Sequence, residues 1–444
     1  MWSMDFKKLA KMSLAMMSAG ALLAACGNGD SADSGKDTSA GTDDQAAVTE
    51  LSEPVEITFW HAMNGPHQEA LTELVNKFNE SQDMVTVNEQ GQGSYDDLNQ
   101  SIKAAATSGD LPTMTQLTPT DVPELASNDI LVPLTDEYLT ERGLEQETLD
   151  DIYEGFLDSS LYQGERFALP FSKSVRVMFY NQDLLDEHDA EVPKSWDDLV
   201  ALGQKMAEAN SDAVALGLEN GIEMEWETLA RQNGSKFADG EVAELNTPEA
   251  VEPLEMIQTM LDEGYARTAG EDGYMSGPFG NGASAVYIGS SAGTAHVAPA
   301  AEGINWSTAP IPTYNDTELA LFAGNDLGLF QSASAEEQLA FVEFMKFLLE
   351  PENSAQWAEA TGYLPVRQSA LESDSYQKFL EENPAYKAPT EMLDYGMASQ
   401  TFANYSTFRQ NTIDAMESVT ISGNKPQDAL DTLQKQTEAL YQEN

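Results

Sequence analysis

The sequence predicts a mixed α/β fold divided into two lobes. Strand and helix patterns alternate directly after residue 54, and the same alternation returns between residues 166 and 330. The globular part is also long, because it runs from residue 54 to residue 444. A single hydrophobic core stops growing at about 250–300 residues, so a chain of this length is expected to divide.

The first part of the globular region predicts a βαβαβ arrangement. Alternating apolar residues indicate strands at 55–60, 84–88 and 113–117. Between the first two strands, Pro66 suits the first position of a helix. One apolar helix face follows there, and another follows the second strand; their residues are Leu71, Leu74, Val75 and Phe78, and then Leu98, Ile102 and Ala105. This order favours a mostly parallel sheet flanked by helices.

The rest of the chain continues the alternation and then becomes helical. Ser195 and Asp198 form a predicted capping box for a helix that ends at Ala209. Strands are predicted at 166–180, 213–218, 284–288, 304–311 and 319–330. Helices are predicted at 248–264, 335–350, 353–360 and 426–442, with helical patterns in most of the chain after residue 371.

Charge is the unusual feature of the composition. The chain has 22 Lys and Arg against 75 Asp and Glu, a formal net charge of −53. Such a surface repels phosphate backbones, which excludes nucleic-acid binding by counterion release. The single cysteine and four histidines show no metal-ligand spacing, so we expect no metal and no cofactor. A salty or alkaline habitat would explain the acidity; a lineage that tolerates acidic surfaces is the alternative.

The N-terminus predicts an exported lipoprotein. Residues 1–25 combine three lysines with an apolar stretch that is shorter than the roughly 20 residues of a membrane span, which indicates a signal peptide. The segment Leu23-Ala-Ala-Cys26-Gly27 resembles the bacterial lipobox, which implies cleavage before Cys26 and lipid on its sulfur. An ordinary signal peptide that happens to contain a cysteine is the alternative. Residues 26–53, rich in Gly, Ser, Asp and Thr, predict a flexible tether.

Several segments, taken in order, resemble the extracellular solute-binding proteins (family 1) of carbohydrate-type ABC importers. The similarity is greatest to the glycerol-3-phosphate-binding members. The matching segments span nearly the whole mature chain and include Ile57-Thr-Phe-Trp-His61, Gly93-Ser-Tyr-Asp-Asp97, Pro170-Phe-Ser-Lys-Ser174, Thr361-Gly-Tyr-Leu-Pro365 and Pro426-Gln-Asp-Ala-Leu430.

The resemblance implies a two-lobe, periplasmic-binding-protein-like (type II) fold with a hinge. The N-lobe would comprise residues 54–174 plus 310–362, and the C-lobe residues 175–309 plus 363–444, with crossings near 174, 310 and 362. The implied function is capture of a sugar or oligosaccharide by lobe closure and its delivery to the permease subunits of an ABC transporter. We expect a monomer held by the lipid on Cys26 at the outer face of the bacterial cell membrane.

The resemblance also implies ligand contacts. Tyr95, Ser174, Ser290, Gly324 and Tyr363 match contacting positions of the family. The alternatives are a surface tyrosine, serines that cap local turns and a strand irregularity at the glycine. From the residues themselves, Trp60 and Trp226 are candidate stacking platforms, with core packing as the alternative.

Departures from the family pattern bear on the ligand. The expected anion-binding arginine falls on Thr401, and the nearest arginine is Arg409. Lys173 and Arg176 point to opposite faces of a strand and are expected to decorate the hinge. A buried phosphate without a bidentate guanidinium is poorly compensated, so the sequence favours a neutral sugar. A glycerol-3-phosphate or glycerophosphodiester ligand is the alternative.

An extracellular glycoside hydrolase is the main competing function. It needs a pair of carboxylates, and Glu223, Glu225 and Asp326 are available. In so acidic a chain any one carboxylate is expected to be simply solvated. The sequence contains no G-x-S-x-G, H-E-x-x-H or P-loop motif, so we expect a binding protein rather than an enzyme.

Overall fold

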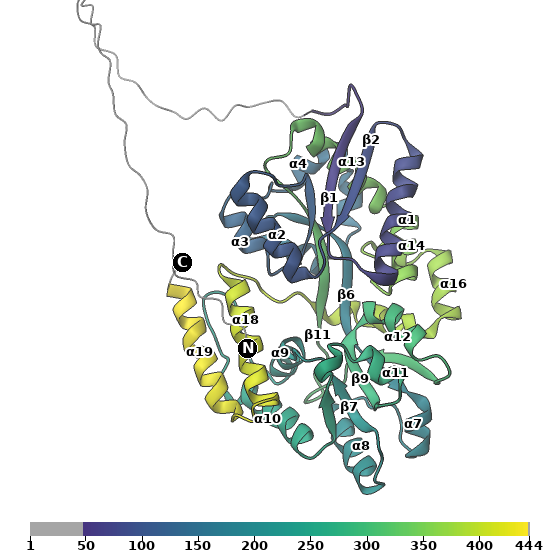
Figure 1. Ribbon diagram of the computed structural model, residues 1–444, viewed down its shortest axis with the longest axis vertical. Coiled ribbons are helices and arrows are strands. Elements are labelled where there is room, and N and C mark those ends of the chain that lie inside the picture. The colour runs from purple at the N-terminus through teal and green to yellow at the C-terminus, as the bar shows by residue number, and fades with distance from the viewer. Residues whose placement is uncertain (1–47, 443–444) are drawn as a thin grey trace, which may run out of the picture. The chain divides into compact units, whose positions relative to one another are not determined.

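A ten-stranded mixed sheet forms the framework of the computed structural model, which describes residues 48–442 (Figure 1). Its strand order is β2-β1-β3-β11-β6-β9-β7-β8, with β10 added beside β6 and β12 beside β11. The predicted signal peptide, Cys26 and nearly all of the tether lie outside the described residues. Among those described, no helix is long and apolar enough to cross a membrane, and no cluster of potential ligands could hold a metal ion.

The predicted βαβαβ run is confirmed. It consists of β1 (Val55–His61), α1 (Gly65–Ser81), β2 (Val85–Gly91), α2 (Tyr95–Ser108) and β3 (Met114–Leu117). The strand β1 pairs in parallel with both β2 and β3. Every residue assigned to the two apolar helix faces is buried. The parallel pairing brings the carboxyl ends of these strands to one edge of the sheet.

Two long strands join the halves of the sheet. The strand β6 (Ala168–Asn181) pairs with β11 (Ala320–Leu329) up to Val175, and from Arg176 onward it pairs with β9 (Ser284–Ser290). The last four residues of β11, Asp326–Leu329, also pair with β3. Figure 1 shows β6 and β11 running between the group that contains β1 and the group that contains β9. We call these groups the N-lobe and the C-lobe.

The strands and longer helices predicted for the rest of the chain lie close to their expected ranges, and the structure adds elements that were not predicted, such as the helix at Glu223–Gln232 and the strand at Ala266–Thr268. The capping box of Ser195 and Asp198 is present at the start of α8. The strands are β7 (Val214–Leu218), β8 (Ala266–Thr268), β10 (Trp306–Pro310) and the short β4 (Leu161–Tyr162), β5 (Glu165–Arg166) and β12 (Gly396–Met397). The longer helices are α8 (Trp196–Glu208), α9 (Glu223–Gln232), α10 (Pro248–Asp262), α13 (Ala335–Leu348), α14 (Pro351–Thr361), α18 (Tyr405–Thr420) and α19 (Pro426–Gln442).

Short helices complete both lobes. They are α3 (Val122–Ser127), α4 (Asp136–Glu141), α5 (Gln146–Asp150), α6 (Glu154–Leu157), α7 (Gln182–Glu187), α11 (Ser276–Gly280), α12 (Thr294–Ala300), α15 (Gln368–Leu371), α16 (Asp374–Glu382) and α17 (Ala388–Glu391).

The hydrogen bonds lead us to place two crossings later than the sequence suggested. Thr313 N donates to Lys194 O at 3.0 Å, so the segment after residue 310 still contacts the C-lobe. The second crossing then falls within β11. Beyond residue 363, Arg367 Nε donates to Asp151 Oδ2 at 2.7 Å, and α15 and α16 pack against α14 of the N-lobe. The third crossing then follows α16, because the chain next contacts β10 at Thr308.

Candidate binding site

Two tyrosines and an asparagine meet where β11 passes between the lobes. Asn325 Nδ2 donates a hydrogen bond of 2.9 Å to Tyr95 Oη, and the Tyr363 hydroxyl also bonds to Tyr95. Tyr363 is only 6% exposed and stacks on Trp357 with an angle of 8° between the rings. Tyr95 keeps 42% of its surface exposed. The site therefore has a fixed, buried back and a tyrosine that is partly exposed to solvent.

The local sequence explains why Tyr95 is held in place. Ser94 caps α2, and its hydroxyl accepts from Asp97 N while the Asp97 carboxylate accepts from Ser94 N. This capping box fixes Tyr95 as the first residue of the helix. Desolvation raises the pKa of Tyr95, although hydrogen bonds from Tyr363 and Asn325 oppose the shift. Tyr95 therefore stays protonated and offers a neutral hydroxyl.

Gly324 is required by the strands themselves. Its φ is +97°, and a Cβ atom there would lie 1.9 Å from Ser172 O of β6. The pairing of β11 with β6 shifts register one residue later, between Asn325 and Asp326. The alternative explanation for Gly324, a strand irregularity, therefore applies. The backbone that lies close to Gly324 is that of β6.

The two predicted serines lie on β6 and β9. Ser174 is buried opposite Ala323. Ser290 ends β9, and its hydroxyl accepts from Ala292 N at 3.3 Å, which is the local capping considered as its alternative. Ser290 also pairs in register with Arg176, just beyond the point where β6 leaves the N-lobe. Both serines therefore lie close to the hinge.

The tryptophans differ in their surroundings. Trp60 is half-buried, and its Nε1 donates to Gln90 Oε1 at 3.1 Å. Trp226 is 0% exposed within α9, and its Nε1 donates to Ala250 O at 2.8 Å. The prediction that Trp226 is a stacking platform is therefore wrong, since both its ring faces and its polar atom are occupied by the core.

The cations at the hinge are paired and buried. Lys173 Nζ lies 2.6 Å from Asp326 Oδ1, and the Arg176 guanidinium binds Glu225. Burial lowers the pKa of Arg176, but Glu225, Tyr287 and Glu219 together raise it above its ordinary value. The expectation that Glu225 and Asp326 are simply solvated is wrong, because both are fully buried against these cations.

Two further residues near the site, Arg409 and Tyr274, were not predicted as ligand contacts. Arg409, on α18, donates to Glu223 Oε1 at 2.7 Å. Burial raises the pKa of Asp121 in the N-lobe, and the positive charge of Arg409 is one of the effects that oppose this rise. Tyr274, in the loop after β8, is 74% exposed and interacts electrostatically with Tyr95. Both come from the C-lobe and act electrostatically on N-lobe residues.

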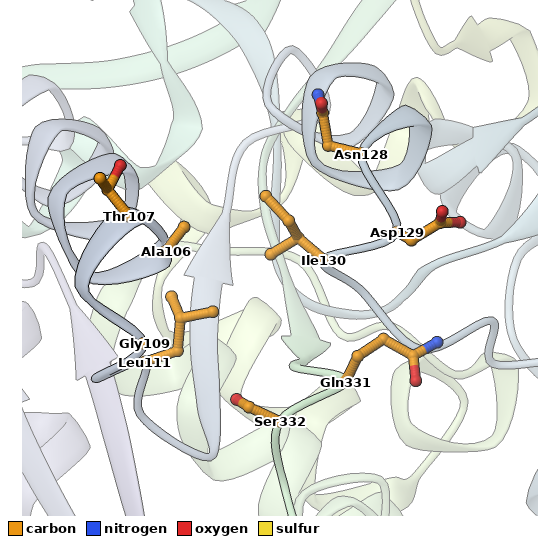
Figure 2. Close-up of a pocket in the computed structure, with 9 residues that line it drawn as sticks. All are labelled: Ala106, Thr107, Gly109, Leu111, Asn128, Asp129, Ile130, Gln331 and Ser332. Atoms are coloured by element: carbon orange, nitrogen blue, oxygen red, sulfur yellow. The ribbon is translucent and has the colours of Figure 1, made fainter. Parts of the chain in front are cut away.

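A surface cavity of about 490 Å³ lies elsewhere on the N-lobe (Figure 2). Its lining comes from the end of α2 and from residues 128–130 and 331–332. None of the predicted site residues lines it, so it is separate from the tyrosine site.

Comparisons with known proteins identify a matching family and similar sequences. Residues 73–388 match the family model described as bacterial extracellular solute-binding protein. The sn-glycerol-3-phosphate-binding periplasmic protein UgpB of Escherichia coli (strain K12) is 27% identical over 399 residues, which cover 85% of this chain and 90% of that protein.

Solved structures show the same fold. UgpB from Mycobacterium tuberculosis in complex with glycerophosphocholine has a TM-score of 0.80 and 22% identity, and the match covers 88% of this chain and 99% of that one. The cyclic α-maltosyl-1,6-maltose binding protein from Arthrobacter globiformis has a TM-score of 0.75 and 25% identity, over 88% and 100% of the two chains. The two-lobe architecture is shared with sugar-binding proteins such as MalE from Xanthomonas citri, at a TM-score of 0.74 and 21% identity over 88% and 98% of the two chains.

Proposed function

Because this chain belongs to the bacterial extracellular solute-binding proteins, we propose that it captures a neutral sugar or oligosaccharide at Tyr95 and delivers it to an ABC transporter permease. The observation that carries this proposal is the hydrogen-bonded group of Tyr95, Asn325 and Tyr363. It combines a partly exposed tyrosine with neutral polar groups, which suits the apolar face and hydroxyls of a sugar.

The mechanism is binding without chemistry. Ser174, Ser290 and Gly324 lie on the strands that run between or end beside the lobes, so a ligand held there touches the hinge. A ligand drives closure only to the extent that it binds the closed form more tightly than the open one. Closure then encloses the sugar, and the closed shape is the one that docks on the permease.

The lipid on Cys26 would keep the receptor at the outer face of the cell membrane. A tether raises the effective concentration of the receptor at its permease without any added contact. Residues 26–53 would supply the reach, and the receptor would act as a monomer.

The charges near the site favour a neutral ligand. Lys173, Arg176 and Arg409 are each committed to a carboxylate of the same chain. A phosphate would have to compete with those carboxylates, whereas a neutral sugar leaves the ion pairs intact.

A glycerophosphodiester is the second candidate ligand. The relative from Mycobacterium tuberculosis is described in complex with glycerophosphocholine. In this chain Arg409 is the residue that favours such a ligand, because 46% of its side chain is exposed and a turn away from Glu223 would free its guanidinium.

A thermal-shift panel tests the proposal. Mono- and oligosaccharides, polyols, glycerol-3-phosphate and glycerophosphocholine are added to the protein lacking residues 1–25. A ligand present at 100 times its dissociation constant stabilises the folded state by about 2.7 kcal/mol. We expect an oligosaccharide to raise the melting temperature of the wild type and of a Met84→Ala control, since Met84 is exposed just before β2.

The variant Tyr95→Ala should lose most of that rise. A shift with glycerol-3-phosphate or glycerophosphocholine alone would contradict the sugar assignment. No shift with any compound would count against the ligand class as a whole.

A further inference from the structure

We propose that Tyr274 is a ligand-binding residue of the C-lobe, which stacks on the bound sugar from the side opposite Tyr95. The inference rests on the proposed function and adds to it a second aromatic wall. A pyranose ring held between the two phenol rings would tie one lobe to the other, so the same contact would bind the sugar and favour closure.

The side chain of Tyr274 is unusually exposed to solvent for an aromatic residue. Among the large hydrophobic residues of residues 48–442 it is the most exposed, at 74%, and Tyr95 is another of the few that are exposed. Most other aromatic rings of the described chain pack in the core or against its edge. An aromatic ring left in water is the kind of surface that binds the apolar face of a ligand.

The loop that carries Tyr274 is fixed at both ends. Asn220 closes the first end, because its side chain accepts from Gly270 N at 2.7 Å and donates to Gly270 O at 2.9 Å. At the second end, Met275 N donates to Glu219 Oε2 at 3.2 Å, and the Met275 side chain is fully buried. The exposed ring therefore stands on a preformed support, which lowers the entropy cost of binding.

The support itself is anchored in the hinge. Glu219 Oε1 accepts from Tyr287 Oη of β9 at 2.5 Å, and desolvation raises the pKa of Glu219 despite that bond. Arg176 of β6 lies close enough to oppose this shift. Hydrogen bonds thus link Tyr287 of β9 through Glu219 to Met275 in the loop of Tyr274, and Arg176 of β6 acts on Glu219 electrostatically.

The position in the fold agrees with a ligand contact. Glu219 and Asn220 follow β7, and the loop of Tyr274 follows β8, which is parallel to β7. Tyr95 lies after β2, at the carboxyl end of the parallel strands of the N-lobe. In open α/β sheets ligands bind beyond the carboxyl ends of the strands. The Tyr274 hydroxyl is also near enough to Tyr95 to act electrostatically on it, which agrees with this placement.

The charges around the two rings select the chemistry of the ligand. Asp121 also acts on Tyr95, and Glu271 and Asp272 precede Tyr274 in its loop. These carboxylates accept hydrogen bonds from sugar hydroxyls and repel a phosphate. A methylated ammonium group also binds aromatic faces, so the choline end of a glycerophosphodiester is the competing occupant that the test must separate.

The first test is chemical crosslinking between the lobes. In a full-length Cys26→Ser background, which has no other cysteine, Tyr95→Cys and Tyr274→Cys are combined and treated with a short bis-maleimide. We expect an intramolecular crosslink by mass spectrometry. The control pair of Tyr95→Cys with Ile421→Cys should not crosslink, since Ile421 is exposed at the far end of the 16-residue helix α18. Equal yields in the two pairs would overturn the juxtaposition.

The second test is calorimetric titration with maltotriose and with glycerophosphocholine. We expect Tyr274→Ala to weaken maltotriose binding at least about tenfold, Tyr274→Phe to stay within about twofold of wild type, and Ile421→Ala to have no effect. If Tyr274→Ala binds maltotriose as tightly as wild type, the inference is wrong and the proposed function stands. If only glycerophosphocholine binds and depends on Tyr274, the sugar assignment is wrong. If neither compound binds the wild type, the proposed ligand class fails, and the crosslink alone decides whether the rings face each other.

Discussion

The Nζ atom of Lys173 lies 2.6 Å from Oδ1 of Asp326, and the two side chains are 1% and 0% exposed. Lys173 belongs to β6 and Asp326 to β11, the two strands that run between the lobes. Lys173 Nζ also donates to Ser159 Oγ at 2.6 Å, and Ser159 Oγ lies 3.1 Å from Asp326 Oδ2. This buried pair fixes the two crossing strands to each other directly beside the register shift at Asn325.

Removing one member of the pair should destabilise the protein strongly. We expect Lys173→Met to lower the free energy of unfolding by about 3–5 kcal/mol, because it leaves the Asp326 carboxylate buried without a cation. The double variant Lys173→Met with Asp326→Leu should recover much of that loss. Urea denaturation measures both. Lys236→Met is the matched control, since Lys236 is mostly exposed and lies 3.9 Å from Glu244; an equal loss in the control would contradict the role of the buried pair.

Gly324 should tolerate no side chain. A Cβ atom would meet Ser172 O at 1.9 Å, and the φ of +97° is itself unfavourable for other residues. Gly109 has a similar φ of +82° but open space around it. We expect Gly109→Ala to lower the free energy of unfolding by about 1 kcal/mol and Gly324→Ala to lower it by at least about 2 kcal/mol more, as measured by urea denaturation. Similar losses at the two positions would show that the approach of β11 to β6 is looser than described.

Stability should fall in mild acid partly because of His67. Its Nε2 donates to Ala292 O of the C-lobe at 3.2 Å and to Thr361 O of the N-lobe at 3.1 Å. Burial, with a smaller effect of His296, lowers the pKa of His67 to about 4 from 6.5. The folded state therefore binds the proton less well than the unfolded state. The contribution is fully present above pH 6.5 and is lost as the pH falls toward 4.

That dependence can be assigned by substitution. A pKa difference of this size corresponds to at most about 3 kcal/mol of unfolding free energy between pH 7 and pH 4. In His67→Phe, unfolding free energies measured at pH 7, 5.5 and 4.5 should fall less steeply than in wild type. An unchanged slope would mean that other groups carry the pH dependence.

Salt should stabilise the protein. With a formal net charge of −53, self-repulsion opposes the compact state at low ionic strength. The screening length falls from about 10 Å at 0.1 M salt to about 3 Å at 1 M. We expect the melting temperature to rise steadily over this range of NaCl. Glycine, which has no net charge, is the control at equal osmolality; a rise no larger than that with glycine would remove the electrostatic explanation.

The parts of the fold that could be predicted are those governed by local pattern. The apolar face of α1 and the capping box of α8 appear as predicted, because helix periodicity and N-cap chemistry need only neighbouring residues. The crossings were harder to place. Nothing in the sequence near residue 310 shows that Thr313 will bond to Lys194, a contact between distant segments.

Only part of the candidate site could be predicted, because several of its contacts join residues that are far apart in the sequence. The resemblance drew attention to Tyr95 and Tyr363, and the structure brings their hydroxyls together. Arg176 and Glu225 are 49 residues apart, so no spacing rule could pair them. The burial of Trp226 could not be predicted, because its position near the start of a helix does not show which neighbours cover its ring. Tyr274 stands among glycine and acidic residues, which indicate only an exposed loop.

Small-angle X-ray scattering tests the central claim, capture of a solute by lobe closure, most directly. The protein lacking residues 1–25 is measured alone and with a saturating amount of the panel compound that stabilises it most, with saturation verified by calorimetry. We predict a smaller radius of gyration in the bound state, and we predict that Gly324→Ala reduces this change. A radius of gyration that stays the same at full saturation would contradict closure and leave a receptor that binds its ligand without moving its lobes.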